Sequence, residues 1–151
     1  RPEDVEFLFH LFVHSRAAAL ALLASGDPAH DALLRMQFTA QDRAYRAQFP
    51  GARFDVVECG GTPIGRLAVD RREHAIHLVD VALLPEHRGR GIATSLLRAL
   101  LAEAAANGQA VTLRVDRDSP ALSLYRRLGF ATVSEDAVYA AMAWRQPKIA
   151  S

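Results

Sequence analysis

The stretch that decides the fold is "PEHRGRGIATSLL", Pro85 to Leu97, in which glycines and cations come directly before an apolar helical pattern. The first backbone N–H groups of a helix have no partner within the helix, and the helix dipole adds partial positive charge there. Gly89 and Gly91 would let an anion approach these N–H groups without a Cβ in the way. Arg88 and Arg90 add positive charge, so the stretch predicts an anion-binding loop at the start of a helix.

The loop matches neither of two common glycine-rich phosphate motifs. The chain lacks G-x-x-x-x-G-K-[ST], which argues against a P-loop, and it lacks G-x-G-x-x-G, which argues against a Rossmann dinucleotide site. Short glycine motifs also arise by accident, so a solvated basic turn is the alternative interpretation of these residues.

Hydrophobic spacing and turn residues predict the elements on either side of the loop. We expect helices from Pro2 to about Leu23, from Pro28 to about Gln48, from Ile92 to just before Asn107-Gly108, and from Pro120 to Gly129. We expect strands at Phe54–Cys59, Ile64–Val69, Ala75–Leu84, Ala110–Val115, Phe130–Val133 and Val138–Trp144. This order combines antiparallel hairpins with one strand–helix–strand crossover, where parallel pairing is expected, so the predicted fold class is α/β.

Two blocks of the sequence resemble one enzyme family. Arg88, Gly91 and Ala93 match the [QR]-x-x-G-x-[GA] signature of the GNAT N-acetyltransferases. The segment "SPALSLYRRLGF", Ser119 to Phe130, resembles the N-x-x-A-x-x-L-Y-x-x-x-G-F block of the same family. The two blocks have the family's order and spacing, and the resemblance covers roughly residues 54 to 144.

The resemblance implies a GNAT fold, a mixed central β-sheet flanked by helices, formed by one domain over residues 1–151. The family usually begins with a strand before its first helix. Only Arg1-Pro2 remains of such a strand here, so we expect the first strand to be truncated or formed by other means.

The same resemblance implies acetyl-CoA as the cosubstrate. The loop and helix start would bind its pyrophosphate, and backbone groups of the preceding strand would take its pantetheine arm as an added strand. The cofactor-binding residues are then Val81, Ala82, Leu83, Arg88, Gly89, Arg90, Gly91, Ile92, Ala93, Thr94 and Asp118. Asp118 stands where the family often has Asn, and an ionised carboxylate accepts hydrogen bonds without donating them.

Acetyl transfer needs a neutral amine and a proton for the leaving thiolate. Tyr125 resembles the family's general acid, whose hydroxyl lies near the cofactor sulfur; the alternative is a core aromatic. His77 stands where several family members place a catalytic Glu or His, and imidazole titrates near neutrality; the alternative is a half-exposed strand residue. Asp80, on the opposite face of the same predicted strand, and Glu58, on a neighbouring strand, are rival candidates for the base.

The acceptor site is expected between the early helices and the strands opposite the cofactor. Polar and aromatic groups share one side of the second predicted helix. The candidates are Gln37, Phe38, Gln41 and Tyr45, with Tyr139 from the last hairpin. Simple burial of Phe38 and Tyr45 in the core is the alternative. The acceptor would be a primary amine of a small molecule or peptide, and its identity stays open.

Composition limits the other classes of protein. Half of the 151 residues are hydrophobic, enough for a core, and the net charge of +1 argues against a nucleic-acid partner. Cys59 is the only cysteine, which excludes an internal disulfide and fits a reducing compartment such as the cytoplasm. The apolar run from Phe7 to Val13 is too short to span a membrane. His74 and His77 would face opposite ways on a strand, so no metal site is expected.

A second class of function fits the same loop. A non-catalytic CoA-binding sensor or interaction module would keep Gly89 to Thr94 and would need neither Tyr125 nor His77. The presence of both residues therefore favours the enzyme. Members of the family are often dimers, so a structural subunit whose exposed edge or final hairpin pairs with a copy of itself as a homodimer is a further alternative to an enzyme that binds an amine substrate.

Overall fold

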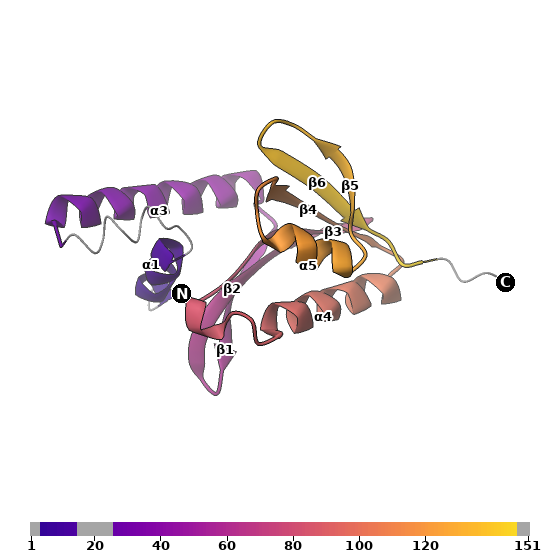
Figure 1. Cartoon of the computed structure of the whole chain (residues 1–151), viewed down its shortest axis with the longest axis horizontal. Coiled ribbons are helices and arrows are strands. Elements are labelled where there is room, and N and C mark those ends of the chain that lie inside the picture. The colour runs from indigo at the N-terminus through magenta and orange to yellow at the C-terminus, as the bar shows by residue number, and fades with distance from the viewer. Residues whose placement is uncertain (1–3, 15–25, 148–151) are drawn as a thin grey trace. The chain divides into compact units, whose positions relative to one another are not determined.

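The computed structural model describes residues 4–14 and 26–147 (Figure 1). The elements along the chain are α1 (Val5–His14), α3 (Pro28–Gln48), β1 (Arg53–Cys59), β2 (Thr62–Arg71), β3 (Ala75–Leu83), the short 3₁₀ helix η2 (Pro85–His87), α4 (Ile92–Ala106), β4 (Ala110–Asp116), α5 (Ala121–Arg127), β5 (Ala131–Glu135) and β6 (Tyr139–Trp144). The predicted order of helices and strands is confirmed. The predicted continuation of the first helix beyond His14 to Leu23 lies outside the described residues.

The start of α3 follows from two residues that the sequence places side by side. Asp27 has an extended backbone, and its Oδ1 accepts a hydrogen bond from the Ala29 N–H at 2.9 Å. Pro28 occupies the first turn, where its missing N–H would have had no partner in any case. The helix ends at Gln48, so it carries all four acceptor-site candidates predicted for it.

The described residues form one mixed sheet of six strands in the order β1-β2-β3-β4-β6-β5. β3 and β4 run parallel, with α4 between them in the chain, whereas β4 with β6 and β5 with β6 run antiparallel. The predicted mixed sheet with one parallel crossover is therefore confirmed. Among the described residues the first strand is β1, which follows α1 and α3.

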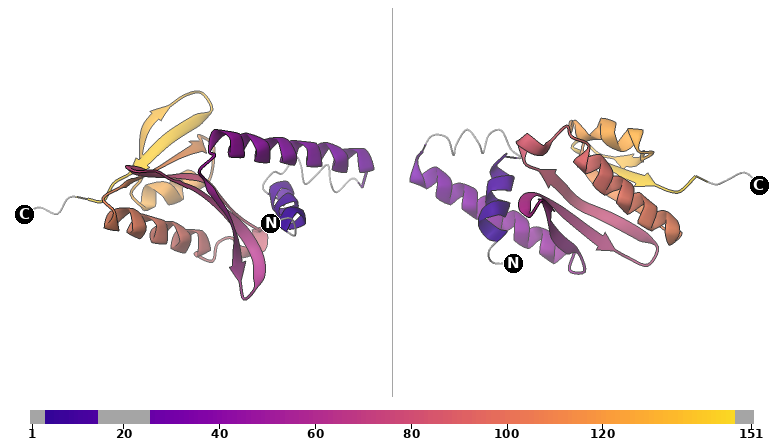
Figure 2. Two further views of the ribbon diagram at one scale, coloured as in Figure 1. Left: turned by 180° about the vertical axis from the view of Figure 1, so that it is seen from behind. Right: turned by 90° about the horizontal axis from the view of Figure 1, so that it is seen from below.

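Internal contacts divide the chain into two compact units. The first unit consists of Arg1–Ala68 and Asp80–Arg90, and the second unit consists of Val69–Val79 and Gly91–Ser151. In the first unit α1 lies beside α3 (Figure 2). Their shared core contains Phe9, Phe12, Val13 and Leu34, with the partly buried Phe38 packed against it. Burial of Phe38, the alternative expected from the sequence, is thus partly realised.

In the second unit α4 packs against β4. The buried residues of this helix recur at spacings of three and four, which is the apolar stripe expected of a helix on a sheet. They are Leu97, Leu100, Leu101 and Ala104. The chain leaves the helix through Asn107 and Gly108, and Gly108 has the left-handed φ of 65° that glycine adopts without strain.

Within the first unit, β2 closely supports the end of β3. The Leu84 N–H donates to the Ile64 carbonyl at 2.8 Å. A Cβ on Gly65 would collide with the Ala82 carbonyl oxygen and with the Leu83 side chain. Glycine at this position therefore allows the backbone of β2 to hold the strand residues that were predicted to contact pantetheine.

Candidate functional site

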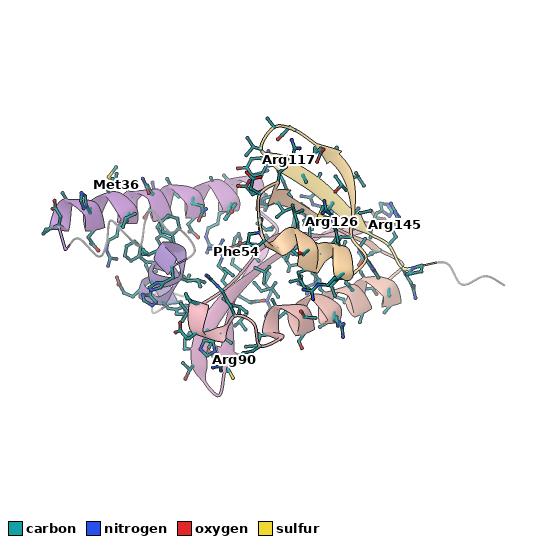
Figure 3. The ribbon with its side chains drawn as sticks, viewed as in Figure 1. Met36, Phe54, Arg90, Arg117, Arg126 and Arg145 are labelled. Carbon is teal, nitrogen blue, oxygen red and sulfur yellow. The ribbon has the colours of Figure 1, made fainter. Side chains whose placement is uncertain are left out.

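Arg88, the first arginine of the loop before α4, donates hydrogen bonds to two backbone carbonyls of the protein. Arg88 Nε donates to the Leu83 carbonyl at 3.0 Å, and Arg88 Nη2 donates to the His14 carbonyl at 3.3 Å. This side chain therefore ties the end of β3 to the end of α1 within the first unit. Arg90, the second predicted cation, is exposed (Figure 3).

The start of α4 presents open hydrogen-bond donors in the second unit. Gly91 is the N-cap residue, with a left-handed backbone at φ 75° and ψ 8° and no capping side chain. The first backbone bond at this end runs from the Ser95 N–H to the Gly91 carbonyl at 2.9 Å, and none of the described residues accepts from the amides of Ile92 to Thr94. A Cβ on Gly91 would meet nothing within 4 Å. Such a helix start suits an anion.

The parallel register of the sheet stops before the end of β3. Ala75–Leu78 of β3 face Ala110–Leu113 of β4, whereas β3 itself continues to Leu83. Val81 to Leu83, predicted to contact pantetheine, lie beyond that register. Backbone groups in such a stretch suit pairing with an added extended chain.

A cavity of about 160 Å³ lies within the first unit, and we call it the Asp80 cavity. It is lined by Leu8, Leu11, Phe12, Phe38, Gln41, Tyr45, Arg66, Asp80, Val81 and Ala82. Three of the residues predicted for the acceptor, Phe38, Gln41 and Tyr45, thus meet one of the predicted bases, Asp80. Gln37 is exposed and does not line this cavity.

A second cavity of about 220 Å³ in the same unit, the Glu58 cavity, contains the third candidate base. It is lined by Asp4, Leu8, Arg46, Phe54, Asp55, Val56, Glu58 and Arg66. Leu8 and Arg66 line both cavities. Glu58 itself is exposed.

Arg66 is the residue of this site that sequence reasoning missed. It is only 6% exposed; its Nε lies 3.3 Å from Asp80 Oδ2, and its Nη1 lies 3.9 Å from Asp42 Oδ1. Its guanidinium carbon lies 5.5 Å from the centre of the Tyr45 ring and 5.3 Å from that of Phe54 (labelled in Figure 3). The available signal was alternation, since Arg66 shares its parity along β2 with the apolar, buried Ile64 and Ala68.

His77 lies in the second unit, where its imidazole is partly buried and close to the Thr112 hydroxyl. Its Nδ1 is 2.8 Å from Thr112 Oγ1. Burial lowers the pKa of the His77 imidazole below its usual 6.5, the positive charge of Arg72 lowers it further, and Asp70 acts in the opposite direction. The neutral imidazole is therefore the dominant form at pH 7. His77 does not line the Asp80 cavity.

This environment predicts how the stability of the protein depends on pH. Because the pKa of His77 is lower in the folded state, the unfolded chain binds more protons below pH 6.5. The contribution of His77 to the free energy of unfolding should be constant above that pH and should fall as the pH drops below it. Urea unfolding of wild type and His77→Gln across this range should show a shallower loss in the variant. Parallel losses in the two proteins would contradict the prediction.

The remaining candidates also lie in the second unit. Tyr125 on α5 is 7% exposed, and its ring centre lies 5.7 Å from that of Phe130 in an edge-on arrangement. The ring is therefore buried against Phe130, the core packing that the sequence left open as the alternative to an acid role, and this packing restricts its motion. Tyr139 is exposed with the Arg114 guanidinium 4.0 Å above its ring, and Asp118 is exposed after β4.

The described part of the chain contains neither a cluster of metal ligands nor a helix suited to crossing a membrane. Residues 4–14 and 26–147 contain no group of three or more His, Cys, Asp or Glu side chains placed to hold a metal ion. None of the helices in these ranges combines the length and apolarity that crossing a bilayer requires.

The mixed sheet, the parallel pairing of β3 with β4 and the open helix start are those of the acetyltransferase fold expected from the sequence. The model of the acetyltransferase (GNAT) family matches residues 21–130, and the chain belongs to this family.

Solved structures agree with the fold. PaiA N-acetyltransferase from Thermoplasma acidophilum, in complex with coenzyme A, is 21% identical; the match covers 95% of this chain and 94% of that chain, with a TM-score of 0.69. An acetyltransferase from Thermus thermophilus is 19% identical, with 96% and 92% covered and a TM-score of 0.65. A GNAT family acetyltransferase from Elizabethkingia anophelis with acetyl-CoA bound is 12% identical, with 66% and 80% covered and a TM-score of 0.58.

Proposed function

We propose that this protein transfers the acetyl group of acetyl-CoA to a primary amine by direct attack of the amine. The observation that carries the proposal is the start of α4, where the amides of Ile92 to Thr94 are open and Gly91 leaves room beside them. Two similar structures contain coenzyme A or acetyl-CoA, which supports the same ligand here.

The residues present fit that ligand. The amides that follow Gly91 would hold the diphosphate, with Gly89, also left-handed at φ 74°, and Arg90 beside them in the chain. Backbone groups of Val81 to Leu83 would hold the pantetheine arm, and Asp118 could only accept a hydrogen bond from it while ionised. When bound, the coenzyme supplies a thioester whose carbonyl carbon a nucleophile can attack.

The amine would enter the Asp80 cavity. There the Asp80 carboxylate would take a proton from the amine, directly or through one water, and Gln41 and Tyr45 would orient it. The amine nitrogen forms the new bond to the acetyl carbon, the carbon–sulfur bond breaks, and its electron pair goes to sulfur. Tyr125 would then give its proton to the thiolate. Asp80 is preferred as the base because it lines the same cavity as the predicted acceptor residues, and His77 is the rival.

Thiol release from acetyl-CoA, followed with a panel of primary amines, tests this function. Release should depend on the amine, and Asp80→Asn should lower kcat/KM about 10²- to 10⁴-fold. His77→Gln is the matched comparison, because it too replaces a titrating group with an amide. The base is the residue whose replacement removes the acidic limb of the pH–rate profile. Release of thiol at the same rate without any amine would contradict amine transfer.

A further inference from the structure

The strongest unexplained feature of the molecule is a pair of buried donors on Arg66. Its Nε and Nη2 atoms are buried and make no hydrogen bond to any described residue. Nε lies 3.3 Å from Asp80 Oδ2, close enough for an ion pair but without hydrogen-bond alignment. A buried donor without an acceptor is costly, so a partner for these N–H groups is expected.

The surroundings hold this guanidinium in place at the wall of the Asp80 cavity. The Tyr45 and Phe54 rings lie 5.5 and 5.3 Å from it, which restricts its motion. Most of the cavity wall is apolar, and these residues are Leu8, Leu11, Phe12, Phe38, Val81 and Ala82. Among the described residues that form this wall, charge is confined to Arg66 and Asp80. The Arg66 side chain and the Asp80 carboxylate thus lie side by side at the wall of a mostly apolar cavity.

Resting on the proposed function, we infer that Arg66 and Asp80 select an acceptor whose amine is separated from a neutral carbonyl oxygen by two carbons, as in an α-amino amide or a peptide amino terminus. Asp80 faces the amine, and Arg66 donates to the carbonyl oxygen. The apolar wall takes the side chain of the acceptor.

The charges in the site should favour an α-amino amide over two chemically similar acceptors, a free amino acid and a diamine. Asp42 and Asp80 already lie 3.9 and 3.3 Å from Arg66, so the carboxylate of a free amino acid would bring a third negative charge to one guanidinium. A diamine would need a carboxylate for its second cation, and Asp80 is the only acid that the described residues contribute to the wall of this cavity. A neutral carbonyl meets neither difficulty.

The test compares acceptors on the wild-type protein. Leucinamide and 3-methylbutylamine share the amine and the branched side chain and differ in the carboxamide; leucine and 1,5-diaminopentane complete the set. We expect kcat/KM, expressed per neutral amine, to favour leucinamide over 3-methylbutylamine by about 10²-fold or more, because donors built for an oxygen reject the analogue that lacks it. Equal use of the two amines, or a preference for leucine or the diamine, would overturn the inference.

Variants test whether Arg66 is the source of the preference for leucinamide over 3-methylbutylamine. Arg66→Lys and Arg66→Met should bring the ratio of the two rates close to one, chiefly through loss of the leucinamide rate. Arg46→Lys is the matched control: Arg46 also pairs with Asp42, at 3.0 Å, and lies 4.5 Å from the Phe54 ring, but it does not line the Asp80 cavity. It should keep the wild-type ratio.

The ratio of kcat/KM for leucinamide to that for 3-methylbutylamine, measured on the wild-type protein, tests the inference even if an Arg66 variant fails to fold. Retention of that ratio in folded Arg66 variants that bind coenzyme A would reject Arg66 as its source. Absence of thiol release with every amine would instead contradict the proposed function, so the two failures are distinguishable.

Discussion

Replacing Tyr125 by phenylalanine should lower kcat about 10²- to 10⁴-fold while the affinity for coenzyme A stays close to that of wild type, the range expected for loss of a general acid. Phenylalanine keeps the ring that packs edge-on against Phe130, so the fold should persist. The lost group is the hydroxyl that would protonate the leaving thiolate. Stopped-flow thiol release under saturating amine and acetyl-CoA measures the effect on kcat directly.

A second variant separates chemistry from packing. Phe130→Leu loosens the contact on the Tyr125 ring, whose centre is 5.7 Å away, without removing the hydroxyl. It should lower the free energy of unfolding by about 1 kcal/mol, and its kcat should fall far less than that of Tyr125→Phe. If Tyr125→Phe keeps kcat within a factor of two, the phenol is a core side chain and the acid must be sought elsewhere.

The next largest effect is expected at Gly91. An aspartate there would put a carboxylate beside the open amides at the start of α4, where the diphosphate is expected. A like charge at about 4 Å costs about 1 to 4 kcal/mol between water-like and protein-surface screening, so coenzyme A should bind about 10- to 10³-fold more weakly. Isothermal titration calorimetry with coenzyme A measures the loss, which should shrink as salt is added.

Gly91→Asn is the matched control, because Asn and Asp both tolerate the left-handed backbone at φ 75° and differ in charge. It should bind coenzyme A more tightly than the aspartate variant. Gly108→Asp, at the far end of the same helix with φ 65°, controls for strain and net charge and should leave binding unchanged. Equal affinity of the Asn and Asp variants at Gly91 would show that no anion sits there.

The sequence predicted the fold well where local chemistry decides the structure. α3 begins at Pro28 as expected, because an N-cap such as Asp27 and a proline act within one turn. The parallel crossover from β3 to β4 through α4 follows from the order of elements alone. α4 begins at Ile92, where the apolar pattern predicted the helix, and the left-handed N-cap at Gly91 is seen only in the structure.

The sequence predicted the candidate site only in part, because tertiary contacts decide the rest. Helical spacing predicted that Phe38, Gln41 and Tyr45 share one side of α3, but the same spacing also included Gln37, which is exposed. The partners of Arg88 are carbonyls, one of them far away in the chain, and no sequence pattern marks those.

The environment of Arg66 could not be predicted from a sequence motif. A single arginine in a strand is ordinarily solvated. The residues next to Arg66 in the sequence do not indicate the carboxylates and rings that surround it in the fold. Arg66 lies two residues from the buried Ile64 and Ala68, so all three share one face of β2. This alternation predicts burial only once the strand and its buried face are known.

The most direct test of the central claim is the identity of the product. The protein is incubated with acetyl-CoA and leucinamide, and mass spectrometry of the amine is compared with the amount of free thiol. The account predicts N-acetyl-leucinamide in a one-to-one ratio with coenzyme A. Tight binding of coenzyme A with no acetylated amine across the whole panel, as expected of a non-catalytic sensor, would contradict it.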